Sequence, residues 1–424
     1  MITKHHRAAR IGVALTSLAL VGVLAGCSSK SAQSTTSTTA AGATTAAQTA
    51  GGTYSLWDPY PDRDAKSTWA AAVNVCATTL GITIDRNSGN TGDTVKDLTT
   101  AAANLPDVAM VDNPKVSTLA DAGLLTTAAE NGLDTSAIQA NILSAGDMNG
   151  KVYGVPVGAN TLGLYYNPTV LTAAGVDIAT VKDYASLTAA IQKVVASGKK
   201  GITFSAVGTE EGSFQFLPWF WGAKADLTKL DSPESLAALT LWTDWVKKGL
   251  APQSVLTNTQ GTSWDEFLTG NFGFAENGSW FQSAADTAGD KVMQIPGVSG
   301  GAAPAPTGGE FMTIPIQKDT KRYATSAKII ECLANGSAGA TALGYVAPSK
   351  AGADAQATAN TPGANAFWVK AVADAKPRTA DNLGTKYSII SEQLYTAVQV
   401  ALSGGSSPTD ALKAAQAAAL KNLG

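Results

Sequence analysis

The residue types best suited to chemistry are concentrated in residues 209–222, which read TEEGSFQFLPWFWG. Two adjacent carboxylates, Glu210 and Glu211, precede five aromatic residues, although the whole chain is only 7% aromatic. Aromatic faces pack on the C–H patches of a sugar ring, and carboxylates accept hydrogen bonds from its hydroxyl groups. The same stretch also suits a buried helix with an acidic first turn. Because residues two apart on a helix point in roughly opposite directions, we expect only one of Trp219 and Trp221 to face a ligand.

Composition excludes several kinds of chemistry. Both histidines, His5 and His6, lie in an N-terminal segment that we expect to be removed. A mature chain without histidine can use neither a Ser-His-Asp or Cys-His mechanism nor a His-ligated zinc ion, and we expect no metal and no cofactor. The net charge is −3, and the sequence contains no basic run and no G-x-x-x-x-G-K-[ST] motif. We therefore expect neither nucleic-acid binding nor ATP hydrolysis.

Residues 1–27 have the three parts of a secretory signal peptide. Basic residues come first, an apolar run follows at 11–24, and the segment ends in Leu-Ala-Gly-Cys at Cys27. The apolar run is shorter than the ~20 residues that a membrane-spanning helix needs. The ending resembles a bacterial lipobox, which implies that Cys27 is lipidated and becomes the mature N-terminus. The alternative is an ordinary signal peptide cut near Gly26. Residues 28–50 lack bulky apolar side chains and are predicted to be a disordered tether.

Strand-like and helix-like stretches alternate from residue 53 onwards. We expect strands at 53–57, 81–85 and 105–111 and helices at 68–80 and 93–104. This alternation is typical of a parallel sheet flanked by helices. The length of 424 residues is sufficient for two lobes, each with its own core.

Polar residues follow two of these strands. Trp57 and Asp58 end the first strand, and Asp112 and Asn113 follow the third. Ligands of open α/β sheets bind beyond the carboxyl ends of the strands, so these four residues are candidates for ligand binding.

The alternation continues to the C-terminus. We expect helices at 186–197, 231–248, 262–268 and 324–335 and a last helix from Pro408, with strands at 201–206 and 270–280. An N-cap serine, Ser232, followed by proline marks the start of one of these helices. Its Trp242 and Trp245 are three residues apart, and we expect both in the core.

Several ordered motifs resemble the maltose-binding-protein-like extracellular solute-binding proteins of bacterial ABC importers. They read PDV at 106–108, ADAGLL at 120–125, NGKVYGVP at 149–156, TLGLYYNP at 161–168, NGSW at 277–280 and GGEF at 308–311. The resemblance implies an α/β, two-lobed periplasmic-binding-protein-like fold with a hinge and an interlobe ligand cleft. It also implies an N-terminal lobe formed by 53–160 with 312–355 and a C-terminal lobe formed by 161–311 with 356–424.

The resemblance also implies roles for individual residues. Asn160 stands where maltose-type binders often carry a sugar-contacting glutamate, and Trp280 matches the tryptophan that stacks on a sugar ring. Glu310 lies in the return crossing between lobes, where a Gly-Gly turn often reaches the ligand. The alternative is that Glu310 is part of the connection alone. Glu211 is expected at the rim of the cleft, with Phe216 packed inward.

Two cysteines remain after Cys27. Cys76 and Cys332 are both expected on helices, and an even pair in an exported chain can form a disulfide. The resemblance places both residues in the N-terminal lobe, where a disulfide is the leading prediction. Two buried free thiols are the alternative.

These observations favour a monomeric, non-enzymatic binding protein with no catalytic residue. It would capture a mono- or oligosaccharide outside the cell membrane, to whose outer face a lipid on Cys27 would anchor it, and deliver the sugar to the transmembrane permease subunits of an ABC importer. One alternative is the same fold binding a peptide or polyamine. Another is an exported glycoside hydrolase, which needs two carboxylates at a fixed separation, such as Glu210 or Glu211 with Asp58 or Asp112.

Overall fold

The computed structural model describes residues 51–89, 91–100 and 105–424 of the chain. In these residues two mixed sheets carry the main strands. The first has the order β2(Thr83–Ser88), β1(Thr53–Asp58), β3(Val108–Asp112), β12(Glu310–Thr313) and β6(Val155–Pro156). The second has the order β10(Lys291–Met293), β7(Leu162–Tyr166), β9(Phe272–Gly278) and β8(Lys200–Thr203). Two-stranded pairs join β11(Pro306–Thr307) to β13(Lys376–Pro377) and β4(Asp147–Met148) to β5(Lys151–Val152).

Helices follow most of the strands, as the alternating pattern predicts. They are α1(Thr68–Leu80), α2(Thr91–Thr100), α3(Asn113–Asp121), α4(Ala140–Leu143), α5(Pro168–Ala173), α6(Tyr184–Ala196), α7(Glu210–Gly222), α8(Pro233–Lys247), α9(Gln260–Leu268), α10(Gln282–Ala288), α11(Tyr323–Ala334), α12(Ala338–Leu343), α13(Lys350–Thr358), α14(Ala366–Ala373), α15(Lys386–Leu402) and α16(Pro408–Leu423). The α/β class is confirmed. The last residues of the helix expected at 93–104 lie outside the described residues. Within the described residues no helix is both apolar enough and long enough to span a bilayer.

Local signals explain several helix boundaries. Ser67 caps the first turn of α1 by accepting a hydrogen bond from the backbone N–H of Ala70, and the helix ends at Gly81 with φ of 66°. Ser232 caps α8 through the N–H of Ser235, with Pro233 in the first turn. The sequence pattern placed the start of the helix at 186 two residues late, because Asp183 is the N-cap and forms a capping box with Ser186.

Parallel pairing places the ends of the first strands together. β1 pairs in parallel with both β2 and β3, whereas β12 runs antiparallel to β3 and β6. The carboxyl ends of β1 and β3, which carry Asp58 and Asp112, therefore lie at the same edge of the sheet. The start of β12 lies at this edge as well, because Glu310 is the register partner of Asp112.

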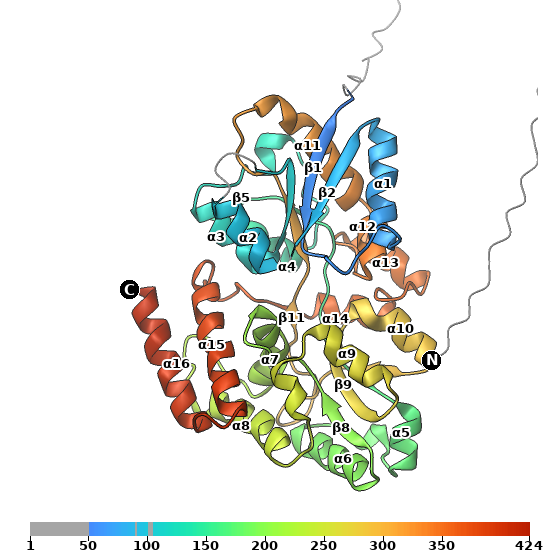
Figure 1. The fold of residues 1–424 in the computed structure, drawn as a ribbon, viewed down its shortest axis with the longest axis vertical. Helices are drawn as coiled ribbons and strands as arrows, with labels where there is room; N and C mark the ends of the chain where they lie inside the picture. The colour runs from blue at the N-terminus through green and yellow to red at the C-terminus, as the bar shows by residue number, and fades with distance from the viewer. Residues whose placement is uncertain (1–50, 90, 101–104) are drawn as a thin grey trace, which may run out of the picture. The chain divides into compact units, whose positions relative to one another are not determined.

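Each large sheet has its own hydrophobic core. Trp69, Met110 and Ile330 are buried in a cluster beside the first sheet, where α1, α11 and α12 lie together (Figure 1). Trp242 and Trp245 are fully buried in a cluster beside the second sheet, which confirms their expected place in a core. The lobe boundaries proposed from the sequence remain a prediction. The return to the N-terminal lobe was expected at residue 312. Strand β12 already pairs with β3 of the first sheet from Glu310, two residues earlier.

Three segments connect the two sheets. The chain runs from β6 into β7 and from β11 into β12, and a third segment follows α12. Isolated bridges pair Asn160 with Gly308 and Ala159 with Val346, so the three segments lie side by side. Residues in these segments can therefore contact both halves of the structure.

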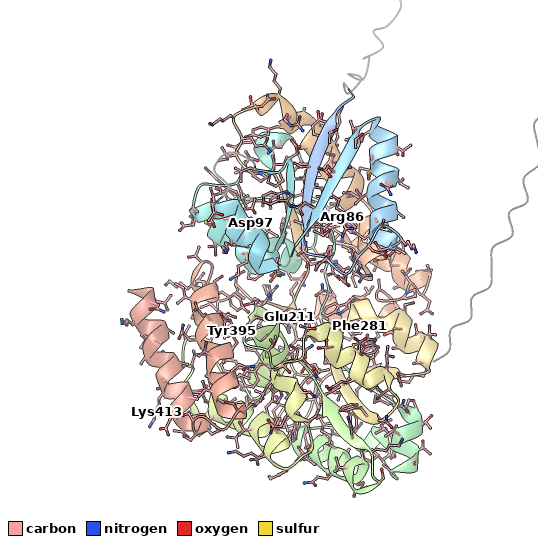
Figure 2. All side chains as sticks on the ribbon, viewed as in Figure 1. Arg86, Asp97, Glu211, Phe281, Tyr395 and Lys413 are labelled. Atoms are coloured by element: carbon pink, nitrogen blue, oxygen red, sulfur yellow. A yellow bond between two sulfur atoms is a disulfide. The ribbon has the colours of Figure 1, made fainter. Side chains whose placement is uncertain are left out.

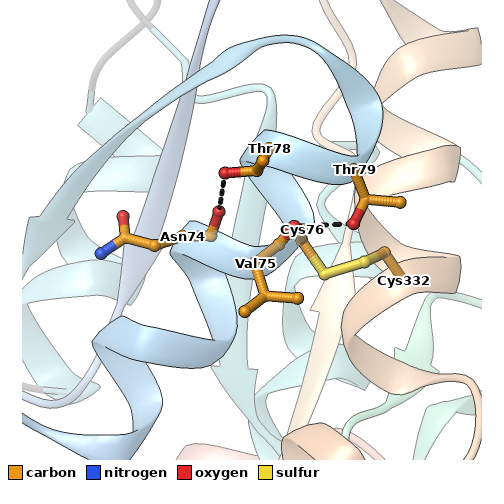
Figure 3. Close-up of a disulfide and its surroundings, with 6 residues drawn as sticks. All are labelled: Asn74, Val75, Cys76, Thr78, Thr79 and Cys332. Carbon is orange, nitrogen blue, oxygen red and sulfur yellow. Dashed lines mark hydrogen bonds between the residues drawn. A yellow bond between two sulfur atoms is a disulfide. The ribbon is translucent and has the colours of Figure 1, made fainter.

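A disulfide joins α1 to α11. Cys76 and Cys332 are bonded with a Cα–Cα distance of 5.8 Å, and they are 256 residues apart in the chain (Figure 3). Cys76 is buried in the core cluster beside the first sheet, and Cys332 packs against the same cluster. A crosslink between such distant residues reduces the conformational entropy of the unfolded chain.

Candidate functional site

Several of the predicted site residues gather at the segments that connect the sheets. Asp112 and Glu310 are neighbours across β3 and β12, and Asn160 pairs with Gly308 just before β12. The backbone N–H of Asn113 donates to the carbonyl of Gly309 at 3.1 Å. The structure therefore brings these four predicted residues to one edge of the first sheet.

Glu310 is buried within a group of tyrosines. The Tyr60 hydroxyl donates to its carboxylate, and the Tyr60 and Tyr345 hydroxyl oxygens are 3.5 Å apart. Burial raises the pKa of the Tyr345 hydroxyl, and the neighbouring Asn160 side chain acts in the opposite direction. Burial, together with the nearby Asp112 carboxylate, raises the pKa of Glu310 to about 7. Near neutral pH this group can therefore donate as well as accept hydrogen bonds, which suits a hydroxyl-rich ligand.

Trp280 lies at the end of β9, beside this group. It is partly buried and packs against the core clusters of both sheets. Its ring lies over Gly278, where an added Cβ would come within 2.0 Å of the ring, so only glycine fits there. The Tyr345 ring meets it edge-on with 6.5 Å between centroids. The Asn-Gly-Ser-Trp motif thus provides an aromatic face next to the Glu310 group.

The two adjacent glutamates of α7 have different environments. Glu210 pairs with the guanidinium of Arg378, at 2.8 Å between Oε1 and a terminal nitrogen. Glu211 accepts a hydrogen bond from the backbone N–H of Gln260 at 3.2 Å, and burial raises the pKa of its carboxyl. Figure 2 shows Glu211 at one end of α7. Since Glu210 is occupied by a salt bridge, Glu211 is the glutamate of this pair that remains a candidate for ligand contact.

Asp58 does not have the exposed position that the sequence suggested. It is fully buried and forms an ion pair with Arg86. It also accepts hydrogen bonds from the Trp69 indole at 3.0 Å and from the backbone N–H of Tyr60 at 3.1 Å. The prediction that Asp58 contacts ligand is therefore corrected. Its carboxylate holds the turn that carries Tyr60, because a buried charge is stable only when it is paired and hydrogen-bonded. Trp57 packs against a cluster on the sheet that includes Val111.

Neither Trp219 nor Trp221 presents a free aromatic face. Trp219 is fully buried against Trp242 and Trp245, and its indole N–H donates to Glu276 at 2.7 Å. Trp221 is 6% exposed, with the Lys376 ammonium 5.1 Å from its ring centroid. The prediction that one of the two faces the ligand is corrected. The reason is that α7 is buried on all sides after its first turn, so no stripe of it is left for solute.

Other residues of this region were not identified from the sequence. Tyr60 stands in a turn that the sequence marked as aromatic and acidic, so it had a local signal. Tyr345 and Arg378 had none that singled them out. Arg378 lies 266 residues from Asp112 and 168 from Glu210, and only folding brings the three together.

Glu276 is a fully buried carboxyl in β9 beneath this region. One oxygen accepts from Trp219, and the other has no hydrogen-bond partner within the described residues. Burial raises the pKa of Glu276 well above its ordinary value, against the opposing effect of the Trp219 hydrogen bond. Burial therefore favours the protonated, neutral form of Glu276 in the folded protein.

Replacing Glu276 by glutamine should change how stability depends on pH. In the unfolded chain the carboxyl ionises above about pH 4.3, whereas in the folded chain it stays protonated to a higher pH. The wild type should therefore lose stability relative to Glu276→Gln by about 1.4 kcal/mol per pH unit above that value, until the folded pKa is reached. Urea unfolding at pH 4, 5, 6 and 7 measures this. A stability difference that is constant across the four pH values would contradict a neutral Glu276.

Comparison with known proteins identifies the family. A family model described as bacterial extracellular solute-binding protein matches residues 68–366. The chain belongs to this family. Its members are solute-binding receptors and not enzymes, and this one is an ABC transporter solute-binding protein with the fold that the motifs implied.

Solved structures show the same fold in receptors of known ligand. The GacH receptor of Streptomyces glaucescens, solved unliganded and with acarbose, is 21% identical with a TM-score of 0.76, over 88% of this chain and 98% of that one. The MalE3 protein of T. maritima, solved with maltose, is 19% identical with a TM-score of 0.76, over 87% and 99% of the two chains. UgpB of Mycobacterium tuberculosis, solved with glycerophosphocholine, is 20% identical with a TM-score of 0.73, over 87% and 98%.

Proposed function

We propose that this solute-binding receptor captures a mono- or oligosaccharide and delivers it to the permease subunits of an ABC importer. The observation that carries the proposal is the aromatic face of Trp280 beside the buried Glu310, Tyr60 and Tyr345 group. A ring face for C–H patches next to groups that both donate and accept hydrogen bonds is complementary to a sugar. The structural likeness to receptors solved with acarbose and with maltose supports the same class of ligand.

In this proposal each residue has a distinct part. Trp280 stacks on a sugar ring, while Glu310, Asn160 and Glu211 exchange hydrogen bonds with its hydroxyl groups. Asp112 and Asn113 line the edge of the sheet beside Glu310. The two lobes close on the sugar by bending at the three connecting segments, which buries it between them.

A thermal-shift screen tests the ligand class. Maltose, acarbose, tagatose, glycerophosphocholine, a peptide mixture and spermidine are each added to the mature protein. A ligand that binds only the folded state raises the melting temperature, and about 2.7 kcal/mol is gained at 100 times the Kd. A shift with a saccharide, accompanied by a change in Trp fluorescence and no hydrolysis product, supports the proposal. A shift with glycerophosphocholine, peptide or spermidine alone overturns the sugar assignment, and sugar turnover would contradict a receptor role.

The proposal includes a lipid anchor at Cys27, which lies outside the described residues. Cys27→Ser removes the thiol that would be acylated. Several acyl chains hold a protein stably on a membrane, so we expect the wild type in the membrane fraction of bacterial cells and Cys27→Ser in the medium or periplasm. Immunoblotting of the fractions measures this. Equal membrane association of the two forms would contradict the anchor.

A further inference from the structure

Arg378 is the most completely enclosed cation of the region around the connecting segments. Its side chain is 2% exposed. The residue directly follows strand β13 in the chain. One terminal nitrogen donates to Asp112 at 3.0 Å and to Glu210 at 2.8 Å, and the other donates to Asn113 at 2.9 Å and also to Asp112. The guanidinium lies over the Phe214 ring, 4.8 Å from its centroid. A planar fork with several donors can hold these acceptors at once, which an ammonium cannot.

The partners of Arg378 belong to both halves of the structure. Asp112 ends β3 of the first sheet, whereas Glu210 begins α7, which is packed in the core of the second. Glu210 is further held by the hydroxyl groups of Tyr387 at 2.7 Å and Ser391 at 2.5 Å, both on α15. A carboxylate–guanidinium–carboxylate bridge therefore spans from one sheet to the helices of the other.

Two residues that contact Arg378, Asn113 and Phe214, also contact the connecting segment that leads into β12. The Asn113 side chain donates to the carbonyl of Thr307 at 3.0 Å, and its backbone N–H donates to Gly309. The Phe214 ring closes over Gly308, where an added Cβ would come within 2.8 Å of it. The position of Glu310, which follows Gly309, thus depends on groups that Arg378 holds.

Charge makes the bridge sensitive to the loss of Arg378. Burial alone lowers the pKa of the guanidinium, but the carboxylates of Asp112 and Glu210 outweigh burial and raise it, so Arg378 stays charged. Without Arg378, the largely buried carboxylates of Asp112 and Glu210 would lie close together with no cation between them. Like charges in a partly buried site repel strongly, and breaking a buried pair is more disruptive than replacing all of its members.

We propose that Arg378 is a positioning residue that holds the two sheets in the arrangement seen here and, through it, places Glu211 and Glu310 for the solute. The first part stands on the contacts alone. The second part rests on the proposed function, because it assumes that these glutamates contact solute.

Spin-label distances test the first part without any ligand. Nitroxides are attached at Lys193→Cys on α6 and Ala324→Cys on α11, both exposed and packed beside different sheets. We expect Arg378→Met to remove at least about half of the population at the wild-type distance. Arg378→Lys should be intermediate, because an ammonium can bridge fewer of the acceptors. Lys376→Met is the matched control, since its carboxylate partner Asp381 is 65% exposed and the ion pair is worth little.

If Arg378→Met fails to fold, Asp112→Asn with Glu210→Gln keeps the cation and neutralises both partners, and the same loss of the wild-type distance is expected. With a solute identified in the screen, Arg378→Met should also raise its Kd at least tenfold, while Lys376→Met leaves it unchanged. Distances and Kd that match the wild type in a folded variant would overturn the proposal. Changed distances in a protein that binds no saccharide would refute the proposed sugar function and leave the positioning role standing.

Discussion

Replacing Trp280 by alanine should raise the Kd for the receptor's sugar at least about 30-fold, equivalent to about 2 kcal/mol. The ring is the partly buried aromatic face beside Glu310, and Gly278 is required to seat it. Stacking and the burial of apolar area are both lost with the ring. Isothermal titration calorimetry with the saccharide found by thermal shift measures the change.

Two variants separate this effect from general damage. Trp280→Phe keeps an aromatic face and should lose less than half of the binding free energy lost in Trp280→Ala. Trp242→Phe changes a ring that is fully buried in the core beside the second sheet, so it should lower the melting temperature with little change in Kd. An unchanged Kd in a folded Trp280→Ala protein would remove Trp280 from the site.

Replacing Arg86 by methionine should cost about 3–5 kcal/mol of folding stability, because it leaves a buried carboxylate without its cation. Asp58 is fully buried, and Arg86 supplies its only cation within the described residues. Arg86 also donates to the carbonyls of Tyr60 and Arg63, so the turn after β1 would lose its anchor. Urea unfolding followed by far-UV circular dichroism measures the loss.

The double variant Asp58→Asn with Arg86→Met provides the internal control. A neutral amide can still accept from Trp69, and no unpaired charge stays buried, so most of the stability should return. Lys350→Met removes the ion pair with Asp354, whose two side chains are 77% and 58% exposed, and should cost less than about 0.5 kcal/mol. If Arg86→Met were as mild as Lys350→Met, the buried pair would not stabilise the fold as described.

Much of the fold was predictable because its signals are local. Alternating strand and helix patterns placed β1, α1 and β3, and serine caps marked the start of α8. Motifs spread along the chain indicated the family, which the family model confirms over residues 68–366. Helix starts were predicted less well than the helices themselves. The N-cap of α6, Asp183, was missed because a capping box is recognised only from the cap and the residue three positions later, here Ser186, together.

The candidate site was predictable only in part. Trp280 and Glu310 stand in motifs with a local Gly turn, and the structure brings them to neighbouring positions through Tyr345. The same local logic failed for Asp58 and Trp219, because a polar or aromatic residue at a strand end or helix start can equally serve the core.

The sequence by itself determined the absence of histidine after residue 6, the α/β alternation and the family, since each depends on composition or on residues close together in the chain. Only the tertiary structure decided which carboxylates are already neutralised: Asp58 by Arg86, and Asp112 and Glu210 by Arg378. The physical reason is that a charge is satisfied by whatever packing places within about 4 Å of it, and across as many as 266 residues of chain no local pattern encodes that partner.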